Sequence, residues 1–111
     1  MPYLVRIMPR AERDFESIFT YIRAESSPVA EAWFIGLAES IASLSEHPLR
    51  NPKTPEERDL RQLLYRTKPH FYRIIYAIDK PGQRVNILHV RHHSRDAFQS
   101  QTAGGPPYAH H

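Results

Sequence analysis

Between residues 9 and 47, the apolar residues recur every three or four positions, which is the spacing of amphipathic helices. The first run contains Ala11, Phe15, Ile18, Phe19 and Ile22. Since proline suits the first helical turn, this run predicts a helix from Pro9 to about Glu25. The second run contains Ala30, Trp33, Phe34, Leu37, Ile41 and Leu44. It predicts a second helix that ends at His47 and Pro48.

The two predicted helices are separated by the short segment Ser26-Ser27-Pro28. In this segment Ser27 is the expected N-cap of the second helix, with Pro28 at its first helical position. A break of so few residues between two amphipathic helices predicts an antiparallel helical hairpin.

The remaining apolar segments have the composition and alternation of strands. A short run covers Tyr3–Met8, and three longer runs cover about Leu60–Thr67, Phe71–Ile78 and Arg84–His92. The second of the longer runs places Tyr72, Ile74, Tyr76 and Ile78 on one face. The third is expected to place Val85, Ile87 and His89 on one face, and Leu88 and Val90 on the other. Because the linkers between these runs are short, an antiparallel meander is expected.

The predicted order is therefore strand, helix, helix, strand, strand, strand. It indicates a two-layer α+β domain in which the helical hairpin packs on a mostly antiparallel four-stranded sheet. Residues 48–58 form a proline-rich polar loop before the second strand. We expect a single domain over residues 1–98 and a flexible polar tail over residues 99–111, where Gly and Pro are frequent.

Composition restricts the class of protein further. The chain has 111 residues, which fits one domain, and no cysteine, which excludes disulfides and thiolate chemistry. No apolar run approaches the roughly 20 residues that span a bilayer, and the N-terminus lacks a signal-peptide pattern. A cytoplasmic protein with no membrane partner is expected.

Charge is divided unevenly along the chain. Residues 1–48 contain four basic and seven acidic residues, whereas residues 49–111 contain eleven basic and five acidic residues. The two halves thus carry −3 and +6. This asymmetry indicates a face for an anionic partner, with solubility alone as the alternative explanation.

Candidate chemistry is concentrated on the predicted strands. Arg61, Arg66, Arg73 and Arg91 come from three strands, with Tyr65, Phe71 and Tyr72 among them. Arginines interleaved with aromatic residues favour contact with phosphates or bases, although such arginines also occur on ordinary solvated sheets. A metal site at His89, His92 and His93 is the alternative for this region, but the flanking arginines would repel a cation. We therefore expect no metal and no cofactor, and no phosphate-binding glycine loop or nucleophile elbow is present.

Several motifs along the chain carry a family resemblance. The predicted first helix has the spacing Ala11-x-x-Asp14-Phe15-x-x-Ile18-x-x-Tyr21-Ile22. Further motifs are Tyr3-x-Val5, Leu44-x-x-x-Pro48, Leu60-Arg61, Tyr72-Arg73-Ile74-Ile75-Tyr76 and Ile87-Leu88-x-Val90-x-His92-x-x-Arg95-Asp96. With these motifs, the chain resembles the ParE/RelE family of toxins from type II toxin–antitoxin systems over about residues 3–98. The combination of the last two motifs is the most specific part of the resemblance.

The resemblance implies an antitoxin partner, ParD-like or similar, which lays an amphipathic helix over the toxin's helical hairpin. On this hairpin the aromatic residues are first expected in the core, and some are candidates to line a groove for a partner helix. The antitoxin-binding candidates are Phe15, Phe19, Ile22, Trp33 and Leu37.

The family also implies two different targets. RelE-like toxins cleave mRNA on the ribosome, whereas ParE-like toxins are associated with poisoning of DNA gyrase. Two positions that are lysines in the RelE-like nucleases look like Leu64 and Arg66 here, and the C-terminal tyrosine falls at Phe98. Part of the acid–base apparatus is thus replaced, and the Val90-to-Asp96 ending looks more like ParE.

We therefore expect a ParE-like toxin that has no committed catalytic residue. Its target-binding candidates are Arg61, Arg66, Arg73, Arg91, His92 and Arg95. If the chain is instead a RelE-like mRNA endonuclease, the candidates for catalysis are Arg66, Arg73, Arg91 and His92. A binding module of the same fold that has lost toxicity is the third alternative.

Overall fold

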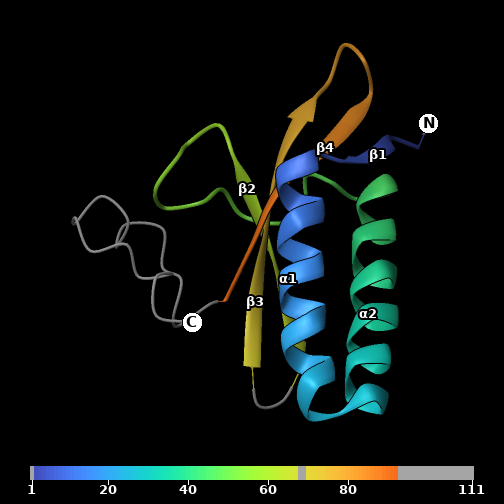
Figure 1. Ribbon diagram of the computed structural model, residues 1–111. Helices are drawn as coiled ribbons and strands as arrows, with labels where there is room; N and C mark the ends of the chain where they lie inside the picture. The colour runs from blue at the N-terminus through green and yellow to red at the C-terminus, as the bar shows by residue number, and fades with distance from the viewer. Residues whose placement is uncertain (1, 68–69, 93–111) are drawn as a thin grey trace.

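The computed structural model describes residues 2–67 and 70–92. In these residues the chain forms two long helices and four strands, with a short 3-10 turn after the second helix (Figure 1). The elements in order are β1 (Leu4–Ile7), α1 (Pro9–Glu25), α2 (Ser27–Ala42), η1 (Ser43–Ser45), β2 (Arg61–Thr67), β3 (His70–Asp79) and β4 (Arg84–His92). The order expected from the hydrophobic pattern is confirmed, while the expected tail over residues 99–111 lies outside the described residues.

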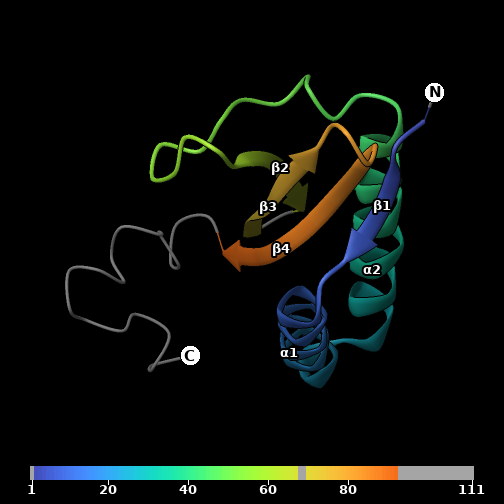
Figure 2. The same ribbon diagram turned by 90° about the horizontal axis from the view of Figure 1, so that it is seen from above.

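The four strands form one mixed sheet in the order β1-β4-β3-β2. The three C-terminal strands pair antiparallel as a meander, and the short β1 pairs parallel to β4. Both helices lie on one side of the curved sheet, so the sheet has a helix-covered face and an open face (Figure 2). This is the expected two-layer α+β arrangement, in which the helical hairpin buries the apolar side of the sheet.

The two helices are joined at a single residue, Ser26, which serves both. Its backbone N–H donates to Ile22 O at the end of α1, and its side-chain oxygen accepts the N–H of Val29 at the start of α2. The expected cap at Ser27 is therefore wrong by one position. Ser27 itself is the first residue of α2, and because Ser26 has an extended backbone, its hydroxyl reaches the first helical turn.

α2 and β2 approach each other closely at Tyr65. The hydroxyl of Tyr65 donates to the backbone O of Trp33 at 2.9 Å. A β-carbon at Gly36 would overlap the same hydroxyl oxygen. The glycine in the middle of α2 therefore leaves room for Tyr65 to reach the helix backbone, and Trp33 packs on the rings of Tyr65 and Tyr72.

A β-bulge in β4 changes which side chains of its second half point toward the core. In the register between β3 and β4, Ile75 is opposite His89, whereas the next residue, Tyr76, is opposite Ile87. Leu88 is the extra residue, so the alternation shifts by one. The expected face of Val85, Ile87 and His89 is wrong at its last member. Because of the bulge, Val90 joins the core with Val85 and Ile87, and His89 lies on the open face.

Asp14 of α1 provides a hydrogen-bond acceptor for the backbone of β4 beyond the end of β1. The backbone N–H of Val90 donates to Oδ2 of Asp14 at 3.0 Å. Arg10, one helical turn earlier, lies 3.6 Å from the other carboxylate oxygen. This contact joins residues that are 76 positions apart and fixes α1 against the bulged half of β4.

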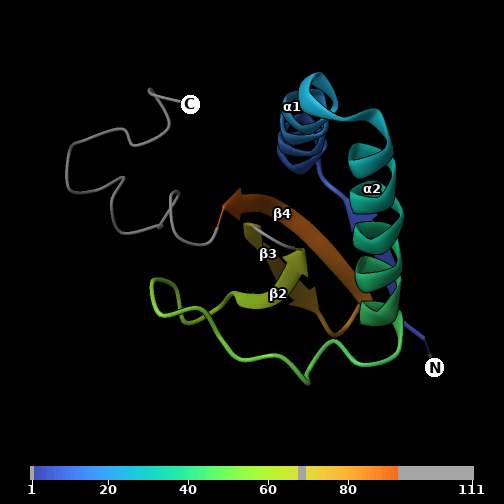
Figure 3. The ribbon, with the colours of Figure 1, turned by 90° about the horizontal axis from the view of Figure 1, so that it is seen from below.

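The segment between η1 and β2 is held to the sheet at its first half by Tyr76. The phenol of Tyr76 donates to Pro48 O at 2.6 Å and accepts from the side-chain amide of Asn51 at 3.2 Å. Burial raises the pKa of Tyr76, which keeps its hydroxyl protonated as a donor. Figure 3 shows this segment leaving the end of α2 and passing around the sheet toward β2. None of the helices in the described residues is long and apolar enough to cross a membrane.

Candidate functional site

The open face of the sheet gathers three of the arginines singled out in the sequence. The register of β2, β3 and β4 places Arg73 beside Leu64 on one side and beside Arg91 on the other. Arg66 lies two residues further along β2, opposite Phe71. Since residues opposite each other in register share a face, Arg66, Arg73 and Arg91 form one cationic strip across three strands.

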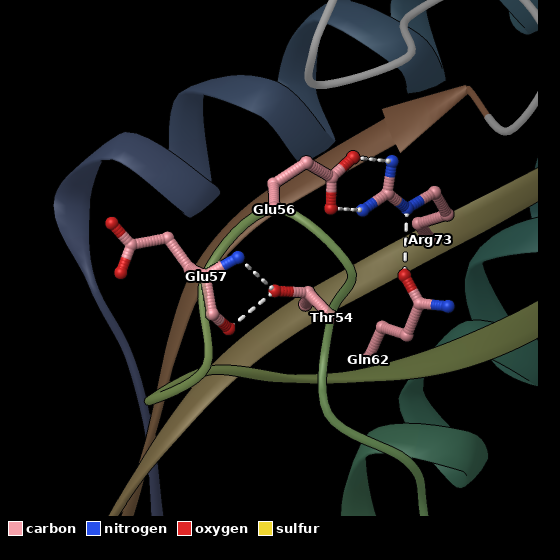
Figure 4. Close-up of polar contacts among 5 residues, drawn as sticks. All are labelled: Thr54, Glu56, Glu57, Gln62 and Arg73. Atoms are coloured by element: carbon pink, nitrogen blue, oxygen red, sulfur yellow. Dashed lines mark hydrogen bonds and ion pairs between the residues drawn. The ribbon is translucent and has the colours of Figure 1, made fainter.

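Arg73 is the most constrained of the three. Its Nη1 and Nη2 donate to the two carboxylate oxygens of Glu56 at 3.0 and 2.8 Å (Figure 4). Its Nε donates to Oε1 of Gln62 at 2.9 Å. The side chain of Arg73 is 5% exposed and that of Glu56 is 13% exposed, so this is a largely buried, bidentate ion pair.

Arg66 and Arg91 differ in their accessibility. Arg66 is exposed, and its guanidinium lies 5.8 Å from the centre of the Phe71 ring. Phe71 is 42% exposed, so this cation–π pair faces solvent. Arg91 is 6% exposed. The strip thus combines one accessible arginine with two covered ones.

Two of the predicted target-binding residues lie away from this strip. Arg61 alternates with Leu63 and Tyr65 of the core, and its Nη1 donates to Asn51 O at 2.6 Å, so it holds the loop before β2. His92 is opposite Tyr72 on the helix-covered face, with ring centres 5.4 Å apart. Arg61 and His92 therefore do not share a face of the sheet with Arg73. Arg95 and Phe98 lie outside the described residues.

Sequence reasoning missed two polar residues of this face. Gln62 alternates on β2 with Leu64 and Arg66, so its position next to Arg73 follows from strand periodicity once the register is known. Glu56 belongs to an irregular loop, and no periodic signal places it near β3. Within residues 2–67 and 70–92, no group of three or more histidine or acidic side chains is arranged to hold a metal ion.

His89 is the titratable ring on the open face. It is half-buried on β4, and its pKa is lowered from the ordinary value of 6.5. Burial is the largest cause, and the charges of Arg91 and Arg10 also lower the pKa, whereas Asp14 acts in the opposite direction. The imidazole is therefore held in its neutral form near pH 7.

The lowered pKa of His89 gives a test of its burial. A base with a lower pKa in the folded state binds fewer protons there than in the unfolded state. The free energy of unfolding should thus fall as the pH drops below about 6.5 toward the folded-state pKa. The melting temperature of the His89→Gln variant should fall less over this pH range than the melting temperature of the parent. Identical pH profiles for the two proteins would contradict this assignment.

A second candidate surface lies between the two helices. An apolar groove of about 370 Å³ is lined by Phe15, Glu16, Phe19, Glu31, Phe34 and Ile35. The rings of Phe19 and Phe34 meet edge to face with centres 6.1 Å apart. Phe34 is 51% exposed and Ile35 is 58% exposed, so large apolar side chains face solvent here.

The groove contains two of the five predicted antitoxin-binding residues. Phe15 and Phe19 line it, and Ile22 is partly buried against the core. Trp33 and Leu37 are 2% and 1% exposed, because this stripe of α2 turns toward the sheet, so they support the groove from within the core. Phe34 was expected in the core. It lies on the apolar stripe of α2 next to the stripe of Trp33 and Leu37, and this second stripe faces solvent. Helical periodicity does not show which of two adjacent apolar stripes faces the sheet.

Comparison with known proteins identifies the family. A family model described as the ParE toxin of the type II toxin–antitoxin system parDE matches residues 5–97. This chain belongs to the ParE toxin family. A search of curated proteins gave no match.

Solved structures of type II toxin–antitoxin systems share the fold of this ParE-family chain. A chain of the RelBE2 toxin–antitoxin complex from Mycobacterium tuberculosis is 28% identical with a TM-score of 0.58, covering 83% of this chain and 99% of its own. A chain of the chromosomal ParDE system from P. aeruginosa is 16% identical with a TM-score of 0.67, covering 81% and 95%. A free variant of the E. coli toxin RelE is 19% identical with a TM-score of 0.60, covering 94% and 97%. The chain is thus a type II toxin of the ParE/RelE superfamily.

Proposed function

We propose that this toxin arrests growth in the cytoplasm by binding DNA gyrase or another replication protein through its open face, without bond-breaking chemistry of its own. The observation that carries the proposal is the strip of Arg66, Arg73 and Arg91, which aligns three cations across three strands, with Arg66 exposed and the other two covered. Such a strip binds anionic groups, and it contains no side chain that transfers protons near neutral pH.

The neighbours of the strip support binding over RNA cleavage. Cleavage by 2′-hydroxyl attack needs a base for the hydroxyl and an acid for the leaving oxygen. Leu64, directly opposite Arg73 and 39% exposed, is inert at a position where the RelE-like nucleases resembled by this chain have lysine. None of the described residues of β2, β3 and β4 is a lysine.

A RelE-like mRNA endonuclease is the second candidate, and His89 is the observation that favours it. Its half-buried imidazole lies on the open face with a lowered pKa, so it is neutral near pH 7 and able to accept a proton. The Mycobacterium tuberculosis RelBE2 chain, at 28% identity, also belongs to a RelBE system.

The two candidates are separated by inducing the full chain in a bacterial host. We expect filamentation with a DNA-damage response and intact message, together with inhibition of DNA supercoiling by purified gyrase. Rapid translational arrest with message cut on ribosomes would replace this proposal with the nuclease. If induction of a well-expressed, folded chain is harmless, the protein is a binding module without toxicity.

We further propose that a ParD-like antitoxin neutralises the toxin by laying an amphipathic helix in the groove of Phe15, Phe19, Phe34 and Ile35. Several structural neighbours are toxin–antitoxin complexes, which supports a partner of this kind. The groove is apolar, and among the described residues the charged side chains that line it are Glu16 and Glu31. A partner helix with apolar residues on one stripe and basic residues at its borders fits this surface.

The groove is tested by the Phe34→Ser substitution. Because the ring is half exposed and meets Phe19 in the groove, its loss should weaken antitoxin binding by about tenfold or more and barely change thermal unfolding. The encoded antitoxin is titrated against the purified toxin by calorimetry. Leu49→Ser, a similarly exposed apolar residue on the loop before β2, is the control. Equal affinities of the two variants would rule out this groove.

A further inference from the structure

The Glu56 carboxylate sits on the end of the Arg73 guanidinium where any bound anion would also sit. Both terminal nitrogens of Arg73 donate to it, and Gln62 takes the remaining Nε–H (Figure 4). With Glu56 in place, the Arg73 side chain is 5% exposed. A target group therefore reaches this arginine only if Glu56 leaves.

Glu56 lies in the tip of the loop before β2, residues 54–59, and this tip is attached at its two ends. The backbone of residues 52–54 pairs with residues 60–62 at the start of β2, through Thr54 N to Leu60 O at 2.8 Å and Gln62 N to Pro52 O at 3.0 Å. Within the tip, the Thr54 hydroxyl donates to Glu57 O at 2.7 Å and accepts the Glu57 N–H at 2.9 Å. Thr54 is 4% exposed and thus anchors the turn that presents Glu56.

The rest of the tip has few attachments. Pro55, Glu57, Arg58 and Asp59 are exposed, and the Glu57 side chain points away from Arg73 (Figure 4). Segments with little buried surface open at lower free energy than the strands beside them. The tip is therefore the part of the open face that is able to move while the sheet stays intact.

We infer that Arg73 is an oxyanion site whose resident occupant is the Glu56 carboxylate, and that an acidic segment of a partner protein binds there by displacing Glu56 as the tip opens. The inference rests on the proposed function in taking the open face as the target-binding face. A largely buried guanidinium is costly without a counter-ion, so one carboxylate replaces another and the cation is never left uncompensated. Glu56 then blocks the Arg73 site of the toxin until the acidic segment of the partner protein displaces it.

The surroundings favour a protein carboxylate over a phosphate. The site already holds a planar carboxylate in a bidentate arrangement. Beside it Leu64 and Phe71 are exposed apolar side chains at 39% and 42%. An acidic segment with apolar neighbours satisfies both features, whereas a nucleic-acid backbone would leave Leu64 without a partner. Arg66 is exposed on the same face and is able to meet the first acidic group before the tip opens.

The test compares Glu56→Gln with Glu57→Gln in the full-length chain. Both remove one negative charge from adjacent loop positions, but only the first removes the carboxylate that Nη1 and Nη2 of Arg73 bind. A hexaglutamate peptide is the probe, with a hexathymidylate oligonucleotide in the parallel arm, and the Arg73 Nε–Hε signal is followed by nuclear magnetic resonance. We expect the peptide to bind Glu56→Gln about tenfold more tightly than it binds Glu57→Gln or the parent, because a charge-assisted competitor of roughly 1.4 kcal/mol is lost.

Each other outcome overturns part of the inference. Equal peptide binding by both variants would show that Glu56 does not occupy the site. A larger gain for the oligonucleotide would assign the site to nucleic acid. Reduced toxicity of a folded Glu56→Gln variant would make Glu56 part of the working surface. If Arg73→Gln stays fully toxic while Glu56→Gln binds the peptide more tightly, the proposed function fails and the oxyanion site stands.

Thr54→Val provides a second variant, in case Glu56→Gln folds poorly. It keeps the Glu56 carboxylate and the side-chain shape at position 54, and removes only the hydroxyl that anchors the turn. We expect a smaller gain in peptide affinity, about two- to fivefold, because the tip opens more often. Unchanged affinity in a folded Thr54→Val variant would show that the tip does not limit access to Arg73.

Discussion

Replacing Gly36 with alanine is expected to destabilise the protein by about 2 kcal/mol, although alanine is the better helix former. The added methyl group would overlap the Tyr65 hydroxyl oxygen, which is bonded to Trp33 O. Overpacking of roughly 1–3 kcal/mol and loss of a hydrogen bond of about 1 kcal/mol outweigh a propensity gain near 1 kcal/mol. Thermal unfolding should show a melting temperature lowered by roughly 10 °C.

A double-mutant cycle with Tyr65→Phe isolates the cause. Without the hydroxyl, the nearest atom to the added methyl group is the ring carbon Cζ, at 3.2 Å. Small shifts of the ring accommodate a contact of this length. In the Tyr65→Phe background, Gly36→Ala should therefore cost little or stabilise the protein. If the cost of Gly36→Ala is the same with and without the hydroxyl, the close approach between α2 and β2 is not its origin.

The Arg73→Gln substitution should abolish growth arrest on induction. It removes a bidentate cation from the centre of the open face, and such contacts contribute roughly 1.5–3 kcal/mol to binding, or about tenfold or more in affinity. Charge reversal at this position would place a second carboxylate beside that of Glu56 and confound folding with function, so glutamine is the better choice. The measurement is growth after induction, with toxin abundance followed in parallel.

Arg84→Gln is the matched control for Arg73. Arg84 also pairs with a carboxylate, Asp79 at 3.3 Å, but at the hairpin end of the sheet. Both variants lose one positive charge and one ion pair, so a general effect of charge would appear in both. Because the Arg73 pair is largely buried and the Arg84 pair is exposed, thermal unfolding of both variants is measured as well, to separate loss of stability from loss of target binding. Growth arrest by folded Arg73→Gln as strong as that by Arg84→Gln would remove the open face from the proposed mechanism.

The elements of the fold follow from periodicity, but their finer placement does not. The two helices and the meander are predicted because helical and strand spacings differ clearly along the chain. The bulge at Leu88 is not predicted, since a one-residue insertion in β4 is visible only when β3 is beside it. For the same reason the alternation extrapolated from Val85 and Ile87 fails at His89 and Val90.

The candidate site is predictable only in part. Arg66, Arg73 and Arg91 emerge from the strands, and the alternation of Arg61 with Leu63 and Tyr65 already indicates that Arg61 faces the core side. Glu56 is beyond sequence reasoning, because its contact with Arg73 depends on the path of an irregular loop. In the helices, periodicity finds the apolar stripes but not which of them, that of Trp33 or that of Phe34, faces outward.

The position of β4 has a consequence for synthesis of the toxin. β4 is an interior strand, and both strands that flank it, β1 and β3, precede it in the chain. Leu4 has its partner at Arg84, so β1 has no neighbour until the last described strand has been translated. A nascent chain or a product of premature termination lacks this strand, and with it Arg91 and the backbone partner of Asp14. Toxicity should therefore be acquired in one step at the end of translation, and shortened products should be harmless targets for proteases.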